Sequence, residues 1–144
     1  MAVKAIPTGH HSVSPYLVAT GVEKLIPFLE QAFEGECIER QQRPDGVTAH
    51  AEVRIGDSIV MMGEASEQWK AMPAALYVYL TDVDTTYRRA VGAGGRVLSE
   101  PSDMFYGDRS GAVIDPCGNY WWIATHIEDV SPEELQKRMQ AQKK

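Results

Sequence analysis

The sequence predicts one α+β domain made of two βαβββ modules, which form a curved mixed sheet around a cavity. The first observation is an internal repeat. At an offset of 61 residues Thr20-Gly21-Val22-Glu23 aligns with Thr81-Asp82-Val83-Asp84, and at an offset of 62 Gly56-Asp57 aligns with Gly118-Asn119. The second is that each half reads as a strand, a helix and three further strands. A sheet covered on one face by its helix leaves the other face bare, so two modules can enclose a ligand.

The third observation is a tight turn that enters the last strand. Pro116 presets a turn, Gly118 tolerates the positive φ that closes it, and the aromatic residues after it favour a strand. Neighbouring strand residues face opposite ways, so Trp121 and Trp122 lie in different environments. We expect Trp121 to pack under the helices and Trp122 to face the cavity.

In the first module, helical spacing predicts a helix over about 23–33. Pro27 is tolerable only in the first turn, where its missing N–H is not needed, so the helix should begin at about Glu23. The strand after the Pro44-Asp45-Gly46 turn alternates, so residues 47, 49, 51, 53 and 55 should pack on this helix. The side chains of His50, Glu52 and Arg54 should then face the cavity. The expected strands are 12–19, 36–43, 47–55 and 58–62.

The second module repeats this order. We expect a helix with Val83, Tyr87, Ala90 and Val91 on its buried side, ending at the glycines of 92–95. The expected strands are 76–80, 96–99, 111–115 and 119–123. The whole chain, 1–144, is predicted to be a single domain with module one at about 13–64, module two at about 74–126 and a C-terminal helix at about 131–141.

Composition excludes several classes of partner. The chain has 144 residues, 44% of them apolar, and a net charge of −6, which gives no electrostatic attraction for nucleic acid. No apolar run approaches the roughly 18 residues that span a bilayer, and the first residues lack a secretory signal. We expect a cytoplasmic protein with no membrane partner. Cys37 and Cys117 form no CxxC motif and are expected to be free structural thiols.

Four segments resemble a known family. The Asp115–Asn119 turn, with the repeat, resembles the vicinal oxygen chelate superfamily, which includes glyoxalase I, extradiol dioxygenases and bleomycin resistance proteins. The segments His50–Ser58, Tyr106–Gly111 and Ala124–Ser131 resemble its PhnB-like branch. The resemblance covers about 13–126 and implies the glyoxalase/bleomycin resistance fold, a homodimer and a small-molecule ligand.

Enzymes of that superfamily hold a divalent metal on four cavity-facing strand positions. The matching residues here are Ser14, Val60 or Met61, Ala75 and Trp122. Divalent ions need imidazole, carboxylate or thiolate donors, and these side chains provide none of them. The resemblance therefore predicts no metal at the usual site, and we expect no cofactor.

Aromatic residues take the place of those ligands. Strand alternation puts Tyr16, Tyr77, Tyr79, Tyr120 and Trp122 on the cavity face. Tyrosine and tryptophan offer flat apolar area and a hydrogen-bonding group, which suits a small aromatic or amphipathic ligand.

His50 and Glu52 are the candidate catalytic residues. They stand two positions apart on one strand face, close enough to act as a general base with its orienting carboxylate or as two displaced metal ligands. Alternatively they form a polar binding pair, or a pair that faces solvent or a partner subunit.

Other polar residues also allow two interpretations. Tyr106 and Arg109 belong to a loop at the cavity mouth, where Arg109 could grip a ligand anion with Asp108 holding its guanidinium, or could pair with Asp108 only to pin the loop. Trp69 either covers the cavity or covers core. His126 is expected to be a hydrogen-bonded surface histidine. His10 and His11 are expected to be exposed.

Three functions fit these patterns. The first is a metal-free protein that binds a small molecule in the aromatic cavity. The second is a lyase, isomerase or dioxygenase-like enzyme that uses His50 and Glu52 with a displaced metal or as an acid-base pair. The third is a homodimeric accessory module whose cavity is filled core.

Overall fold

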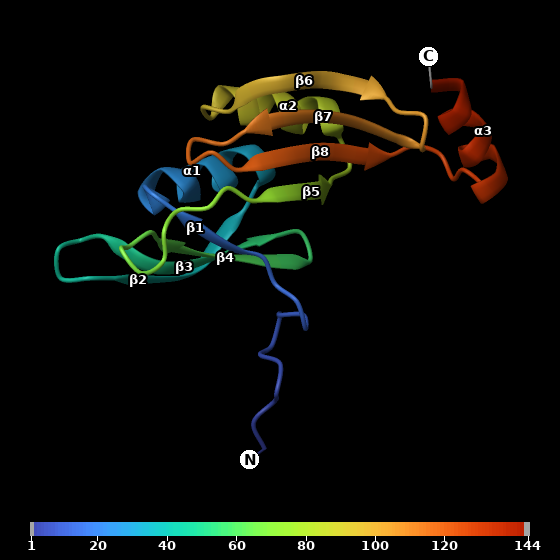
Figure 1. Ribbon diagram of the computed structural model, residues 1–144. Helices are drawn as coiled ribbons and strands as arrows, with labels where there is room; N and C mark the ends of the chain where they lie inside the picture. Colours follow the sequence, from blue (N-terminus) through green and yellow to red (C-terminus); the bar gives the residue numbers. More distant parts are fainter. Residues whose placement is uncertain (1, 143–144) are drawn as a thin grey trace.

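The computed structural model describes residues 2–142 and contains two four-stranded sheets (Figure 1). In each sheet the first strand pairs in parallel with the last strand, while the other pairs are antiparallel. The α+β class and the two-module arrangement predicted from the repeat are therefore confirmed. The first sheet, in the order β1-β4-β3-β2, consists of β1 (Tyr16–Ala19), β2 (Glu36–Gln42), β3 (Thr48–Ile55) and β4 (Ser58–Glu64), with helix α1 (Val22–Phe33).

The second sheet has the same connectivity, in the order β5-β8-β7-β6. Beyond it, the C-terminal helix stands at the end of the sheet (Figure 1), where Arg138 holds it by hydrogen bonds to Glu128 and to the carbonyl oxygen of Phe105. The elements of this half are β5 (Ala75–Tyr79), α2 (Val83–Gly92), β6 (Arg96–Asp103), β7 (Asp108–Ile114), β8 (Tyr120–His126) and α3 (Pro132–Gln142).

Each module ties the start of its helix to its last strand in the same way. The backbone N–H groups of Gly21 and Val22 donate to the carboxylate of Glu64 at 2.9 and 3.0 Å, and Val83 N–H donates to Thr125 Oγ1 at 2.9 Å. These N–H groups have no partner within the helix and lie at its positive end, so an acceptor here stabilises the helix. Glu64 and Thr125 stand 61 positions apart, so the repeat extends to the capping residue.

One apolar core lies between the two sheets, where α1 and α2 pack on each other. Trp121 is 2% exposed, and its ring centroid lies 4.8 Å from that of Phe33 in α1. Asp115 fixes the turn before β8 by accepting from Trp121 Nε1 at 2.9 Å and from the backbone N–H groups of Cys117 and Asn119 at 2.8 and 3.0 Å. The expectation that Trp121 packs under the helices is confirmed.

The start of β1 and the position of Pro27 were predicted wrongly. Strand pairing begins at Tyr16 rather than residue 12, and the residue before it, Pro15, has no N–H for a sheet ladder. Helix α1 begins at Val22, which puts Pro27 in its second turn, so the carbonyl of Glu23 loses the helical hydrogen bond that a backbone N–H at this position would make.

The predicted alternation of β3 also fails at one end. The register shifts between Gln41 and Gln42 of β2, so Ala49 is an extra residue and Thr48 turns toward α1, where its hydroxyl donates to Glu23. Ala49 is exposed and does not pack on the helix. In α2, Val91 is exposed instead of buried, and Thr86 is buried in its place.

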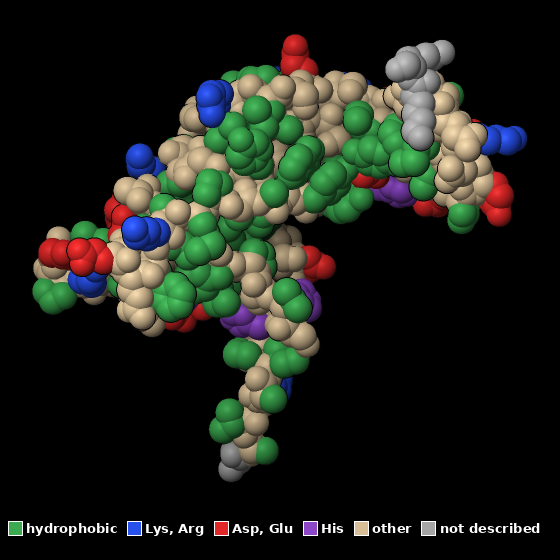
Figure 2. Space-filling view, in the orientation of Figure 1, with side chains coloured by type: hydrophobic (Ala, Val, Ile, Leu, Met, Phe, Trp, Pro, Cys, Tyr) green, Lys and Arg blue, Asp and Glu red, His purple; other side chains and the backbone are tan. Residues whose placement is uncertain are grey.

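Each sheet keeps one face that no helix covers. Figure 2 shows apolar side chains spread over the second sheet and a hollow between this sheet and the N-terminal segment. Within residues 2–142, no helix is both long and apolar enough to cross a membrane.

Candidate functional site

Four aromatic side chains lie on the uncovered face of the second sheet, and we call this set the aromatic face: Tyr77, Tyr79, Tyr120 and Trp122. They are 38 to 60% exposed, whereas the residues between them along the strands face the core. Tyr77 is the direct partner of Trp122 across β5 and β8, and the rings of Tyr77 and Tyr79 have centroids 5.2 Å apart. Strand alternation predicted this shared face.

A buried carboxylate anchors the two tyrosines of β5. Asp108 at the start of β7 is 3% exposed and accepts hydrogen bonds from the hydroxyls of Tyr77 at 2.7 Å and Tyr79 at 2.9 Å. Two small, buried residues lie between Tyr79 and β7 on this face: Ala124 pairs with Tyr79, and Ser110 pairs with Ala124 on the next strand. Because their hydroxyl protons point at Asp108, the tyrosine oxygens offer acceptors to a ligand.

The ionisation of this group follows from its contacts. Burial, reinforced by the hydrogen bonds to Tyr106 and Asp108, raises the pKa of Tyr77 well above its ordinary value, and the bond to Asp108 raises the pKa of Tyr79. Burial alone would raise the pKa of Asp108, but the bonds from His126, Tyr77 and Tyr79 outweigh it and lower that pKa. Both tyrosines therefore stay neutral over an ionised Asp108 at neutral pH.

His126 lies between two carboxylates. Its Nδ1 is 2.8 Å from Asp108 and its Nε2 is 2.8 Å from Asp129, so both ring nitrogens face acceptors. These two bonds, the one to Asp108 first, raise the pKa of His126 and favour the doubly protonated ring. The expected hydrogen-bonded surface histidine is confirmed. A protonated ring held at both nitrogens has no lone pair for accepting a proton or binding a metal.

Arg109 does not lie where a ligand-gripping residue would. Its side chain points to α2, where Nε and Nη2 bind the two carboxylate oxygens of Asp84 at 3.1 Å, and Nη1 binds Asp103 at 3.1 Å. Asp108, its neighbour on β7, faces the opposite side of the sheet. The predicted pairing of Arg109 with Asp108 is therefore wrong, and Arg109 instead ties α2 to the sheet. Tyr106 does reach the aromatic face, with its hydroxyl 3.3 Å from that of Tyr77.

A second polar group lies on the uncovered face of the first sheet. His50 Nε2 is 3.0 Å from one carboxylate oxygen of Glu52, and His10 Nε2 is 3.1 Å from the other. On the far side of the ring, His50 Nδ1 is 3.3 Å from the hydroxyl of Tyr16. The side chains of His10, His50 and Glu52 are only 14, 23 and 13% exposed. His10 was predicted to be exposed, and this is wrong.

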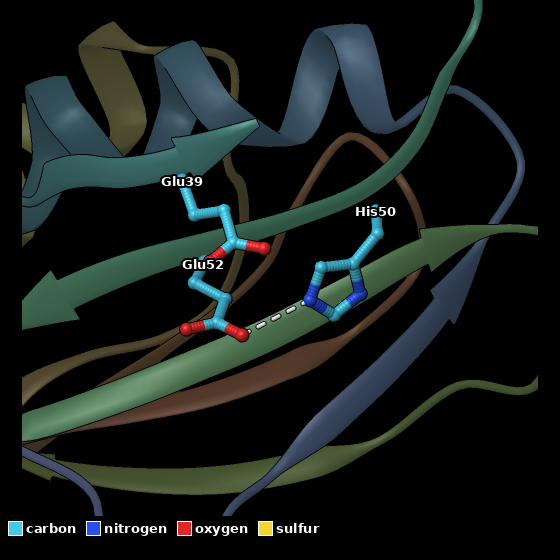
Figure 3. A group of neighbouring side chains, drawn as sticks. All are labelled: Glu39, His50 and Glu52. Atoms are coloured by element: carbon cyan, nitrogen blue, oxygen red, sulfur yellow. Dashed lines mark hydrogen bonds and ion pairs between the residues drawn. The ribbon is translucent and has the colours of Figure 1, made fainter. Parts of the chain in front are cut away.

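Glu39 completes this group, which we call the histidine-glutamate cluster: His10, Glu39, His50 and Glu52. Glu39 in β2 is the direct cross-strand partner of Glu52, and Figure 3 shows Glu39, His50 and Glu52 gathered together. One ligand atom from each of these three residues lies within 4.8 Å of the others. The register shift between Cys37 and Glu39 is what aligns Glu39 with Glu52.

Two clefts adjoin these groups. One, of about 560 Å³, is shared by both modules of the chain and is lined by Tyr77 and Tyr79 together with the turn between β3 and β4. The other, of about 460 Å³, lies on the first sheet, where Tyr16 and Gly63 form part of its wall beside Trp69. Tyr16 therefore lies apart from the other predicted aromatic residues, and Trp69, 62% exposed, covers no core.

The residues at the four usual metal positions of the resembling family do not fit a metal. Ser14 lies two residues before Tyr16, the residue that pairs with Met61 on β4. Ala75 lies on β5 and Trp122 on β8. None of Ser14, Val60, Met61, Ala75 and Trp122 carries an imidazole, carboxylate or thiolate. Among residues 2–142, Glu39, His50 and Glu52 form the one group of three possible ligands that lie close together.

Sequence reasoning missed His10 and Glu39 for different reasons. His10 follows Gly9, which has φ of +87°, and its N–H bonds to the carbonyl of Pro7, so the Pro7–Gly9 turn was a signal for a chain that folds back. Glu39 depends on the register shift after Cys37, and no residue type near it in the sequence indicates that shift.

Comparison with known proteins agrees with this architecture. Residues 10–123 match the family model of the glyoxalase/bleomycin resistance protein/dioxygenase superfamily. An uncharacterized protein of Mycobacterium bovis is 32% identical over 99% of this chain and 98% of its own length.

Solved structures show the same fold at lower identity. The crystal structure of TioX from Micromonospora sp. ML1 superposes with a TM-score of 0.69 at 23% identity, over 81% of this chain and 100% of TioX. The PhnB protein of Bacillus cereus superposes with a TM-score of 0.60 at 15% identity, over 80% of this chain and 99% of that one.

Proposed function

Because this chain belongs to the glyoxalase/bleomycin resistance protein/dioxygenase superfamily, we propose that it is a PhnB-like member that binds a small aromatic or amphipathic molecule and uses no metal at the family's usual positions. The observation that carries the proposal is the aromatic face. Trp122 stands where a member enzyme would have a metal ligand, and it lies beside Tyr77. Flat, partly exposed rings suit stacking rather than coordination.

The geometry also favours a particular polar group on the ligand. The hydroxyls of Tyr77 and Tyr79 donate to Asp108, so their oxygens can only accept from a ligand. The charge of Asp108 is already offset by the protonated His126, so the attraction for a cation comes from the faces of the aromatic rings. We therefore expect a ligand with an aromatic body and a hydrogen-bond donor, such as an amine, at its polar end.

Two probes of the same shape test this proposal. We expect naphthylmethylamine to raise the melting temperature and naphthoate to do so far less, since they differ in the charge at the polar end. Trp122→Ala should weaken amine binding at least about tenfold, whereas Trp69→Ala, which removes an exposed tryptophan from the first-sheet cleft, should not. Equal binding of both probes, or equal loss in both variants, would contradict the proposal.

A second candidate function is favoured by the line of contacts from Glu52 through His50 to Tyr16. When His50 donates from Nε2 to Glu52, its Nδ1 accepts from the hydroxyl of Tyr16. His50 and Glu52 then form an acid-base pair that can take the hydroxyl proton of Tyr16 at the edge of the cleft. This arrangement suits a lyase or isomerase. Turnover of a proton-transfer substrate that is lost in His50→Ala and in Tyr16→Phe, but kept in His11→Ala, would support it.

We also propose that the chain is a homodimer in the cytoplasm. A second copy of the chain that packs on the second sheet would bury part of its exposed apolar area. Light scattering after gel filtration should then give a mass about twice 16.0 kDa. A monomer at micromolar concentration would contradict the proposal.

A further inference from the structure

We propose that the histidine-glutamate cluster is a site for a first-row divalent cation such as Zn²⁺, bound by Glu39, His50 and Glu52 with His10 as a fourth ligand. This site is independent of ligand binding at the aromatic face. It lies on β2 and β3, away from the four family positions, and it uses two residues that come from a bulge and from the N-terminal segment.

The first argument is electrostatic. Glu39 and Glu52 stand directly opposite each other on neighbouring antiparallel strands, where two like charges destabilise a sheet. Among residues 2–142, neither carboxylate is paired with a lysine or an arginine, and the nearest arginine on this strand, Arg54, is bound to Glu36. A bound cation would neutralise the two carboxylates and turn their repulsion into attraction.

The second argument is the donor set. Two imidazoles with two carboxylates suit Zn²⁺ and its first-row neighbours, while Mg²⁺ and Ca²⁺ prefer oxygen ligands alone. Ligands at about 2.1 Å from a tetrahedral zinc ion lie about 3.4 Å from one another. His50 Nε2 and Glu52 already approach to 3.0 Å, and the three main ligands lie within 4.8 Å, so side-chain rotations can close the site.

The third argument is the support around the ligands. A histidine that binds metal through one nitrogen usually donates from the other, and His50 Nδ1 is 3.3 Å from the oxygen of Tyr16. Gln41 donates from Nε2 to Glu39 at 2.8 Å, which orients that carboxylate. His10 is brought to Glu52 by the turn at Gly9, so the N-terminal segment adds a fourth possible ligand to the site.

Metal titration of the full untagged chain tests the site. After treatment with a chelator, calorimetry with Zn²⁺ should show about one equivalent bound, Mg²⁺ at the same concentration should show none, and Co²⁺ should give the visible spectrum of a low-coordinate site. His50→Ala and Glu39→Gln should each weaken Zn²⁺ binding at least about tenfold. The matched control His11→Ala, which changes the exposed neighbour of His10, should bind like the wild type.

The stability of Glu39→Gln gives a second readout with opposite signs. In chelator, the variant should have a higher melting temperature than the wild type because one of two facing charges is gone. Addition of Zn²⁺ should raise the melting temperature of the variant less than that of the wild type. A lower melting temperature in chelator would overturn the electrostatic argument. Absence of stoichiometric Zn²⁺ binding, binding that survives His50→Ala, or an equal loss in His11→Ala would overturn the site, whatever the naphthyl probes do at the aromatic face.

Discussion

A Cβ atom at Gly63 would lie 2.6 Å from the hydroxyl oxygen of Tyr16, closer than any side chain tolerates. Gly63 is also the strand partner of His50, so the absence of a side chain here is what lets Tyr16 reach across β4 to His50 Nδ1. A glycine on one strand thereby determines the orientation of an imidazole on the next.

We predict that Gly63→Ala moves the hydroxyl of Tyr16 away from His50. Because that hydroxyl orients the ring, Zn²⁺ affinity should fall about tenfold while the fold persists. Calorimetry gives the affinity, and nitrogen NMR of His50 reports its tautomer. Gly92→Ala is the control, since a Cβ at Gly92 meets nothing within 4 Å. An unchanged tautomer in Gly63→Ala would contradict the role assigned to Tyr16.

The His126 contacts predict a pH-dependent stability. Its raised pKa means that it stabilises the fold fully below its unfolded pKa, near 6.5, and loses this effect as the pH rises through its folded pKa. The lowered pKa of Asp108 has the reverse sense: its stabilisation is present above about 3.8 and is lost as the pH falls through the folded pKa.

The wild type should therefore be more stable than His126→Gln, with the largest difference between about pH 3.8 and about pH 6.5. This difference in stability should shrink at alkaline pH. Urea unfolding at about pH 5 and about pH 9 measures it. His11→Gln, which replaces an exposed histidine, is the control variant. A larger difference at pH 9 than at pH 5 would show that the ring is not held as a cation.

Removal of the carboxylate of Glu64 should destabilise the protein through α1. Two backbone N–H groups, those of Gly21 and Val22, lose their acceptor, so we expect Glu64→Ala to cost about 1 to 2 kcal/mol. Thr125→Val should cost about as much, because it removes the acceptor of the Val83 N–H and also the hydroxyl that donates to the carbonyl oxygen of Leu80 at 2.7 Å. Chemical denaturation measures both, with Glu67→Ala on the exposed connecting loop as the control. Equal effects of Glu64→Ala and Glu67→Ala would exclude the capping role.

The thiol of Cys117 should react slowly at neutral pH. Burial, with the nearby Asp115 charge, raises the pKa of the Cys117 thiol to about 11, and its Sγ lies 3.3 Å from the carbonyl oxygen of Gly21. In a Cys37→Ala variant, labelling by iodoacetamide should be slow at neutral pH and should accelerate toward pH 11, because the thiolate is the reactive form. Fast labelling of Cys117 at neutral pH in the folded protein would contradict its burial.

Much of the fold could be predicted from local patterns. The repeat located both modules, and the alternation of β5 and β8 put Tyr77, Tyr79, Tyr120 and Trp122 on one face, because side chains on a strand alternate with a period of two. The same rule failed in β3, where a bulge at Ala49 turned Thr48 toward α1. Bulges arise from how two strands fit together, and the sequence of one strand does not reveal them.

The site depended more on contacts between distant segments. Arg109 was assigned to Asp108 because they are neighbours in the chain, yet adjacent strand residues point to opposite faces, and its partners come from α2 and β6. Strand alternation grouped Tyr16 with the other aromatic residues on one cavity face, but Tyr16 lies beside His50 on the first sheet.

The sequence by itself determined the two modules, the family and the lack of metal-binding side chains at the usual positions, since these depend on residue type and spacing. Only the tertiary structure decided that Glu39 faces Glu52 and that His10 folds back onto it. These contacts join residues 13 and 42 positions apart. They arise from strand register and from the path of the N-terminal segment, both of which are set by packing between elements rather than by any local pattern.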